Sequence, residues 1–162
     1  MDAASHRNTL SFVAARIARL FPALARSSHA TVEAIASQAI PASYPVGTTI
    51  FSDRSPCAGF PLILSGVVHV GQRYPNGREL QLYRVKAGES CLMSGSCLLA
   101  DVHFAATGVA QTDVELLVLP PDAFRELIAE DDVFRGYVFG LFGERLAALM
   151  ALVEANAFRK LD

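Results

Sequence analysis

The sequence has little positive charge to offer a nucleic acid. Its 14 Lys and Arg residues are outnumbered by 16 Asp and Glu residues, so the formal net charge is −2 and the pI is about 6.1. Domains that bind nucleic acid on their own are usually basic, with Lys and Arg clustered on one face. We therefore do not expect these residues to contact DNA directly.

Cysteine is also scarce, and no secretory signal is evident. Three cysteines, an odd number, fit a reducing cytoplasm better than a disulfide framework. The N-terminal stretch from Phe12 to Ala25 is apolar in places, but Arg16 and Arg19 interrupt it. No run there approaches the roughly 18 apolar residues of a membrane span. We expect an amphipathic helix, a cytoplasmic protein and no membrane partner.

The usual signatures of an enzyme are missing. A small barrel enzyme of the cupin type, which is the rival class, needs two or three histidines and a carboxylate converging on a metal. The chain has one histidine within a predicted strand, His69, and no His-x-His pair. No Ser/His/Asp spacing, P-loop or Rossmann glycine run occurs either. We therefore predict that the domain is not an enzyme.

The chain has ample apolar material for a core. It is 52% hydrophobic with a mean hydropathy of +0.33, which is typical of a compact domain. Residues 1–41 are expected to be helical, with a first helix ended or kinked by Pro22 and a second from Thr31 to Gln38.

Residues 42–121 have the pattern of an antiparallel sheet. Asn76-Gly77 is a strong hairpin signal because both residues tolerate positive φ. Short strands with glycine-rich turns indicate a β-barrel or jelly roll, so we predict a mainly β member of the α+β class. The expected strands are Thr48–Phe51, Phe60–Leu64, Val67–Tyr74, Glu79–Arg84, Thr107–Ala110 and Val114–Leu119.

Residues 122–162 are expected to form a short helix capped by Asp122 and then a long helix from about Asp132 to Phe158. A second apolar set, on a neighbouring face of this helix, would pack on the barrel: Phe134, Val138, Leu141, Ala148 and Leu152. Two apolar faces favour a homodimer, while one wide core-facing stripe in a monomer is the alternative. Apolar positions at alternating spacings of three and four predict a coiled-coil seam, continued by a polar residue: Phe139, Phe142, Leu146, Leu149, Val153 and Asn156.

The order of these elements resembles the effector-binding half of bacterial regulators of the Crp/Fnr family. The matching segments are FPLILSGVVHV (60–70), GRELQLYRVKAGES (77–90), VELLVLPPDAFREL (114–127) and the terminal helix. The resemblance implies a cyclic-nucleotide-binding-like double-stranded β-helix with a long dimerisation helix. It also implies a DNA-binding domain beyond Asp162, so we favour a fragment of a longer regulator over the alternative of a natural stand-alone domain. The cysteine cluster of iron–sulfur relatives is absent, because no cysteine precedes Cys57.

The resemblance places a ligand cassette at residues 88–106. In cyclic-nucleotide-binding relatives it supplies a glutamate for the ribose and an arginine for the phosphate; here Glu89 can take the first role, but Phe104 and Ala105 stand where the arginine and a small hydroxyl residue are expected. A buried phosphate needs a paired charge, so a cyclic nucleotide is not expected. The predicted effector site comprises Glu89, Cys91, Met93, Ser94, Cys97, Leu98, Phe104, Ala105, Leu149 and Met150.

The nature of the effector is left open between three kinds. One is a small apolar molecule, and another is haem, with Cys91, Cys97, His69 or His103 as conceivable axial ligands. The last is a thiol sensor. Cysteines six apart on one helix point about 120° from each other, so their disulfide requires Ser94–Ser96 to break the helix. The Ser-Gly-Ser sequence of this segment is typical of such a break, which we expect. Each cysteine is otherwise a small buried hydrophobe.

Overall fold

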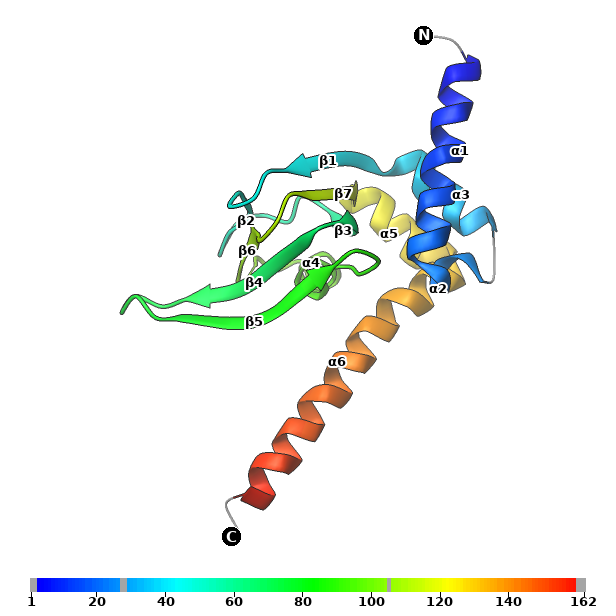
Figure 1. Ribbon diagram of the computed structural model, residues 1–162. Coiled ribbons are helices and arrows are strands. Elements are labelled where there is room, and N and C mark those ends of the chain that lie inside the picture. Colours follow the sequence, from blue (N-terminus) through cyan, green and yellow to red (C-terminus); the bar gives the residue numbers. More distant parts are fainter. Residues whose placement is uncertain (1–2, 27–28, 105, 160–162) are drawn as a thin grey trace.

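The computed structural model describes residues 3–26, 29–104 and 106–159 (Figure 1). Helices hold 49% of the chain, and the antiparallel sheets and long C-terminal helix that the fold-class prediction expects are both present. The helices are α1 (Ala3–Leu20), α2 (Pro22–Ala25), α3 (His29–Gln38), α4 (Leu92–Ala100), α5 (Pro121–Glu130) and α6 (Asp132–Arg159). The strands are β1 (Ile40–Tyr44), β2 (Thr49–Phe51), β3 (Phe60–Ser65), β4 (Val67–Arg73), β5 (Glu79–Lys86), β6 (Thr107–Ala110) and β7 (Val114–Leu119).

Two antiparallel sheets face each other, in the strand orders β1-β7-β3 and β2-β6-β4-β5. Strand β1 was not anticipated from the sequence. It pairs with β7 from Ile40↔Val118 to Tyr44↔Val114, at the edge of its sheet. Pro41 donates no hydrogen bond to a ladder, and edge strands are where sheets accept proline. At the tip of the β4–β5 hairpin, Gly77 has φ +79, as the Asn-Gly signal predicts.

The three-stranded sheet separates two apolar cores. Its outer face contributes Phe60, Leu62 and Leu119 to a cluster with the helices, where Ile17 and Phe134 are also fully buried. Its inner face contributes Ile63 and Leu116 to a second cluster that fills part of the space between the two sheets. The four-stranded sheet closes this roll from the other side, and α4 lies at its end (Figure 1). A ligand inside the roll would therefore share the space between the two sheets with these core side chains.

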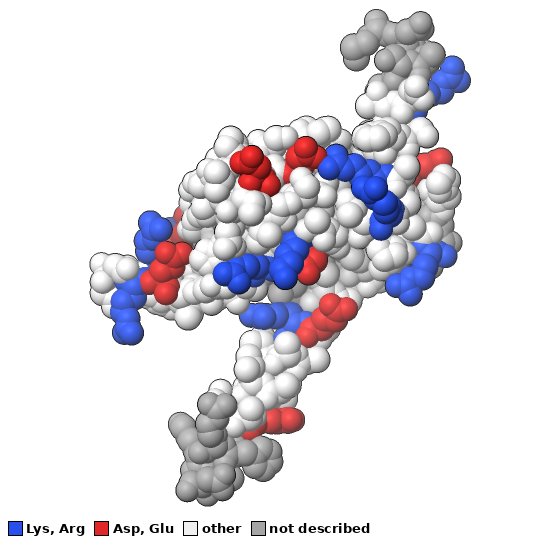
Figure 2. Space-filling model, in the orientation of Figure 1, with Lys and Arg blue, Asp and Glu red and all other residues white. Residues whose placement is uncertain are grey.

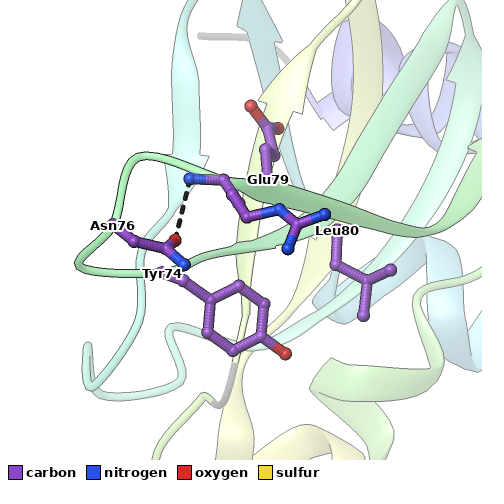
Figure 3. A pocket seen from close by; sticks show the side chains of 5 residues that line it. Tyr74, Asn76, Glu79 and Leu80 are labelled. Carbon is purple, nitrogen blue, oxygen red and sulfur yellow. Dashed lines mark hydrogen bonds between the residues drawn. The ribbon is translucent and has the colours of Figure 1, made fainter.

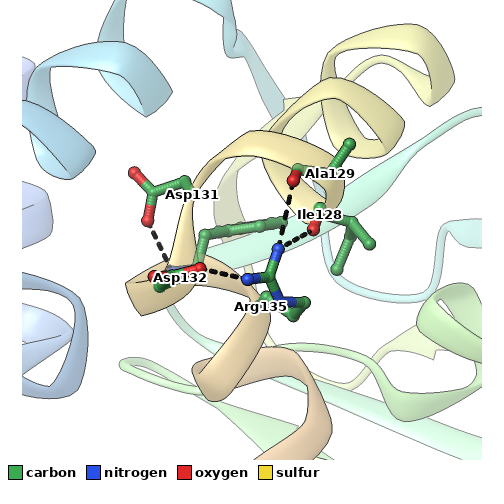
Figure 4. A network of polar contacts seen from close by, with 6 residues as sticks. Ile128, Ala129, Asp131, Asp132 and Arg135 are labelled. Carbon is green, nitrogen blue, oxygen red and sulfur yellow. Dashed lines mark hydrogen bonds and ion pairs between the residues drawn. The ribbon is translucent and has the colours of Figure 1, made fainter.

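The corner between α5 and α6 is held by polar contacts (Figure 4). Asp131 accepts the Phe134 N–H at 2.9 Å and the Thr31 hydroxyl at 2.7 Å, so one carboxylate caps α6 and ties it to α3. Arg135 donates to the carbonyls of Ile128 and Ala129 at the end of α5 and pairs with Asp132. Asp122, expected to cap α5, instead lies inside its first turn and pairs with Arg125, because Pro120 is the N-cap residue.

Helix α6 contacts the body only along its first half. Phe134 and Val138 are fully buried, and Leu141 and Phe142 are half-buried. From Leu146 to Ala157, a segment named here the outer half of α6, every residue is exposed. Of the second apolar set, Ala148 and Leu152 thus do not reach the barrel. Figure 2 shows few charged side chains on the outer half of α6. By length and composition alone, residues Asp132–Ala157 of α6 are long and apolar enough to cross a membrane, with a mean hydropathy of 1.4.

Candidate functional site

A cavity of about 220 Å³ opens between the two sheets of the roll. Most of its wall is apolar, with a few hydroxyl groups. Among the described residues that line it, none carries a charge, a histidine ring or a thiol. The lining residues are Tyr44, Thr49, Ile50, Phe51, Ser52, Ser55, Pro56, Ala58, Gly59, Pro61, Ser94, Phe104, Leu116 and Val118.

An aromatic pair forms one wall of the cavity. Phe104 is 4% exposed and stacks on Phe51, with ring centroids 4.4 Å apart and an interplanar angle of 23°. A Cβ placed on Gly108 would lie 2.2 Å from Cε1 of Phe51, so only glycine leaves room for this ring. Such stacked pairs add about 0.5–1.5 kcal/mol beyond simple burial. At the position where the resemblance expects an arginine, the cavity wall is therefore formed by a closely packed aromatic pair.

Helix α4 borders the cavity through Ser94, which is 2% exposed. The helix runs without interruption through Ser94–Ser96, so the expected break there is wrong. Cys91 is its N-cap residue and makes no side-chain cap hydrogen bond. Tyr83 of β5 accepts the Met93 N–H at 3.1 Å instead. Burial, and secondly the Cys91 thiol 3.6 Å away, raise the pKa of Tyr83, which keeps the phenol neutral.

The three cysteines are free thiols in the structure. Cys91 and Cys97 are each 3% exposed, and Cys57 is half-buried. Burial raises the pKa of Cys97 to about 11 and also raises the pKa of Cys57. Because the thiolate is the reactive form, these thiols are poorly suited to fast redox sensing at neutral pH.

The conceivable haem ligands do not face one space. His69 alternates along β4 with the inward-facing Val68 and Val70, and its Nδ1 lies 3.8 Å from Glu79. His103 is exposed in the loop after α4. No group of three or more His, Cys, Asp or Glu side chains suited to a metal ion occurs among the described residues. The cavity is also below the roughly 300 Å³ at which pockets for drug-sized ligands begin.

The remaining predicted site residues lie in four places. Met93 and Cys91 pack in the roll core beside the cavity, whereas Leu98 packs in the helical core. Glu89 is exposed in the turn after β5, where its carboxylate accepts the Lys86 N–H at 2.8 Å. Leu149 and Met150 lie in the outer half of α6, 45% and 54% exposed. Ala105 lies outside the described residues. The cavity residues that the sequence reasoning missed, above all Phe51 and Tyr44, are aromatic side chains in short strands.

A wider and shallower hollow lies at the tip of the β4–β5 hairpin (Figure 3). Tyr74, Asn76, Glu79 and Leu80 line it together with Arg78, whose N–H donates to Asn76 Oδ1 at 3.1 Å. All of these residues are exposed, so the hollow lacks the burial of a ligand site.

Comparisons with known proteins agree with this fold. A sequence profile described as "Cyclic nucleotide-binding domain" matches residues 41–131. A "CRP-like cAMP-activated global transcriptional regulator" of Mycobacterium tuberculosis is 28% identical over 99 residues, which are 61% of this chain and 43% of that protein. The chain thus matches less than half the length of this curated relative.

Three solved structures share the architecture. The Thermus thermophilus catabolite activator protein superposes with a TM-score of 0.72 and 25% identity, covering 85% of this chain and 63% of its own. A protein described as a Crp/Fnr-family transcriptional regulator from Eubacterium rectale superposes with a TM-score of 0.71 and 26% identity. The match covers 84% of this chain and 63% of that protein. A single-substitution variant of a cAMP-binding acyltransferase from Mycobacterium smegmatis superposes with a TM-score of 0.71 and 26% identity. The match covers 87% of this chain and 43% of that protein.

Proposed function

This chain belongs to the cyclic nucleotide-binding domain family, and we propose that it is the effector-sensing and dimerisation domain of a Crp-like transcription regulator in the bacterial cytoplasm. In this proposal the DNA contacts belong to a separate C-terminal domain, which the net charge of −2 on these residues favours. A signal received in the roll would be passed to DNA through α6.

The effector in this proposal is a small, neutral and largely apolar molecule rather than a cyclic nucleotide. The observation that carries it is the cavity wall, where the described lining has no cation and Phe104 stacks on Phe51. A phosphate moved into such a wall loses its hydration and gains no paired charge, at a cost of several kcal/mol. A neutral molecule pays no such penalty and gains contact with the aromatic pair.

The domain is proposed to bind its effector without transforming it. The described cavity wall offers hydroxyl groups but no carboxylate, imidazole or thiol that would serve as a base or nucleophile. The acyltransferase from Mycobacterium smegmatis places a related fold within an enzyme, so the fold by itself does not decide this point.

Dimerisation is proposed to use the apolar seam of α6. Phe139 is 54% exposed, Leu146 61% and Val153 62%. Large apolar side chains in such a row mark interaction sites on soluble proteins. Phe142, also predicted for the seam, packs within the chain: a Cβ placed on Gly95 would lie 3.6 Å from its Cζ. It therefore joins the seam to α4.

The ligand proposal is tested by calorimetry and thermal shift. Cyclic AMP, named in the description of the curated relative, and cyclic GMP are expected to give no binding heat. Phenol and indole, as small neutral aromatic probes, are expected to raise the Tm. The Ser94→Leu variant fills the cavity and should abolish that rise, whereas Ser96→Leu, on the same helix but outside the cavity wall, should keep it. Micromolar binding of cyclic AMP would overturn the proposal, and so would a Tm that neither probe raises.

A further inference from the structure

Tyr83 connects the beginning of α4 to α6. Its hydroxyl accepts the Met93 N–H at 3.1 Å and lies 3.6 Å from the Cys91 sulfur. Its ring lies beneath the guanidinium of Arg145, whose Cζ is 5.5 Å from the ring centroid. One side chain on β5 therefore touches both the helix that borders the cavity and the long helix that leaves the body.

The hydrogen bond to Met93 meets a need of α4. The first N–H groups of a helix have no partner within the helix, and a side chain at the N-cap usually supplies one. Cys91, at the N-cap, does not. The Tyr83 hydroxyl, on strand β5, accepts the N–H of Met93 instead. Met93 directly precedes Ser94, which lines the cavity. The position of Ser94 is thus fixed in part by where the Tyr83 ring lies.

Besides the packing of Phe142 near Gly95, two polar tethers join α6 to this region. The inner one is the hydrogen bond between Tyr137 and Ser90, at 2.8 Å, in a stretch that the fully buried Phe134 and Val138 hold in place. The outer one is Arg145 on Tyr83, about 12 Å further along the helix by its 1.5 Å rise per residue. Beyond Arg145 the described residues of α6 are exposed. Release of the outer tether would leave the packing of Phe142 close to Gly95 as the outermost contact of α6 with the body, so the helix beyond Phe142 would be freer to change direction.

We propose that Tyr83 is a positioning residue that links the cavity to α6, through Met93 on one side and Arg145 on the other. A molecule that enters the cavity and displaces Ser94 must then shift Tyr83 and change its contact with Arg145. Conversely, a change in α6 must alter the protection of the Met93 N–H. The cavity role rests on the proposed function, whereas the link between Arg145 and Met93 is a property of the chain without any effector.

Hydrogen exchange of the Met93 amide, followed by NMR on the whole chain, tests the link. Tyr83→Phe removes the acceptor and is expected to speed exchange at Met93 about fivefold or more, the factor for about 1 kcal/mol of hydrogen bonding. Arg145→Met keeps the Tyr83 hydroxyl as an acceptor and removes only the contact between Arg145 and the ring. A similar acceleration in Arg145→Met is the specific prediction, since a merely local cap would not respond to α6.

Two controls separate this effect from general loosening. Arg125→Met removes a surface cation that pairs with Asp122, and it should leave Met93 unchanged. The Val85 amide of β5 should keep its exchange rate in every variant. An unchanged Met93 rate in Arg145→Met would overturn the link, and an unchanged rate in Tyr83→Phe would overturn the positioning role. Neither result depends on the phenol and indole experiments, so the two proposals fail separately.

Discussion

The substitution Leu149→Glu tests whether the outer half of α6 is a dimer interface. Leu149 is 45% exposed and lies on the same seam as Leu146 and Val153, both more than 60% exposed. Nothing in the described chain covers the outer half of α6, so a single copy leaves these side chains in water. A carboxylate at this position would be solvated in a monomer and would face its own copy in a symmetric dimer.

The expected magnitude follows from the exposed area. Full burial of a leucine is worth about 1.5–3 kcal/mol, so covering the exposed half of Leu149 is worth about 1 kcal/mol in each protomer. The glutamate removes both contributions and adds the desolvation of two facing carboxylates, roughly 2 kcal/mol or more. A total of about 4 kcal/mol weakens the dimer about 1000-fold in Kd.

Sedimentation velocity over a range of protein concentrations measures this change. The matched control is Ala147→Glu, because two residues along a helix turn the side chain about 200° away. We expect the wild type and Ala147→Glu to be dimers and Leu149→Glu to be a monomer. A monomeric wild type or a dimeric Leu149→Glu variant would refute the seam, and selective dissociation of Ala147→Glu would move the interface to the opposite face. Flotation of the wild type with lipid vesicles would instead assign the apolar helix to a membrane.

Three further predictions concern stability and reactivity. Gly140→Ala should stabilise the fold against urea by about 1 kcal/mol, because a Cβ there meets nothing within 4 Å and alanine is the better helix former; no gain would show that another surface packs on this face. Mass spectrometry of iodoacetamide-treated protein at pH 8 should find Cys57 modified before Cys91 and Cys97. The reason is that Cys97 is 3% exposed and burial raises its pKa to about 11. Early modification of Cys97 would contradict its burial. Burial, partly opposed by the Ser90 hydrogen bond, raises the pKa of Tyr137 to about 12, whereas an unfolded tyrosine ionises near pH 10. The unfolded state then loses its proton first, so the stability present below pH 10 should fall by about 2–3 kcal/mol up to pH 12, and Tyr137→Phe should lessen that fall in a pH series of urea titrations.

Where a strand is buried on one face and bounded by turns, its pattern was enough to predict it. The spans Thr107–Ala110 and Val114–Leu119 are confirmed at both ends. The pattern failed at β1, where Pro41 disfavours a strand and only Ala42 and Tyr44 are half-buried. Only pairing with β7 makes that segment a strand, and such pairing between residues far apart in sequence is invisible in a local window.

The predicted effector site stays a prediction, and its main argument depends on one residue type. Phe104 was expected to remove a cation from the pocket, and it does line an uncharged cavity. The break at Ser94–Ser96 was wrong because glycine and serine are tolerated in a helix that packs well: Gly95 lies against Phe60 and Phe142. Tyr83 was overlooked as a contact of α4, although it lies two residues before the inward-facing Val85 and strand alternation points the two side chains the same way.

In the proposed mechanism, the cavity is coupled to the outer half of α6 through the contacts that the first half makes with the body. A helix of 28 residues is about 42 Å long, and only its first half finds apolar partners in the body. A helix that faces water on all sides is normally polar, yet between Leu146 and Ala157 the only charged residue is Glu154. The proposed dimer would cover this segment, whose direction within one chain is set by the last contacts that the body makes with it. Those contacts are Phe142 on Gly95 and Arg145 on Tyr83, and both reach α4 at the cavity. Any displacement of α4 by a bound molecule is consequently applied where α6 leaves the body, and the length of the outer half turns a small change of angle into a large movement at its end.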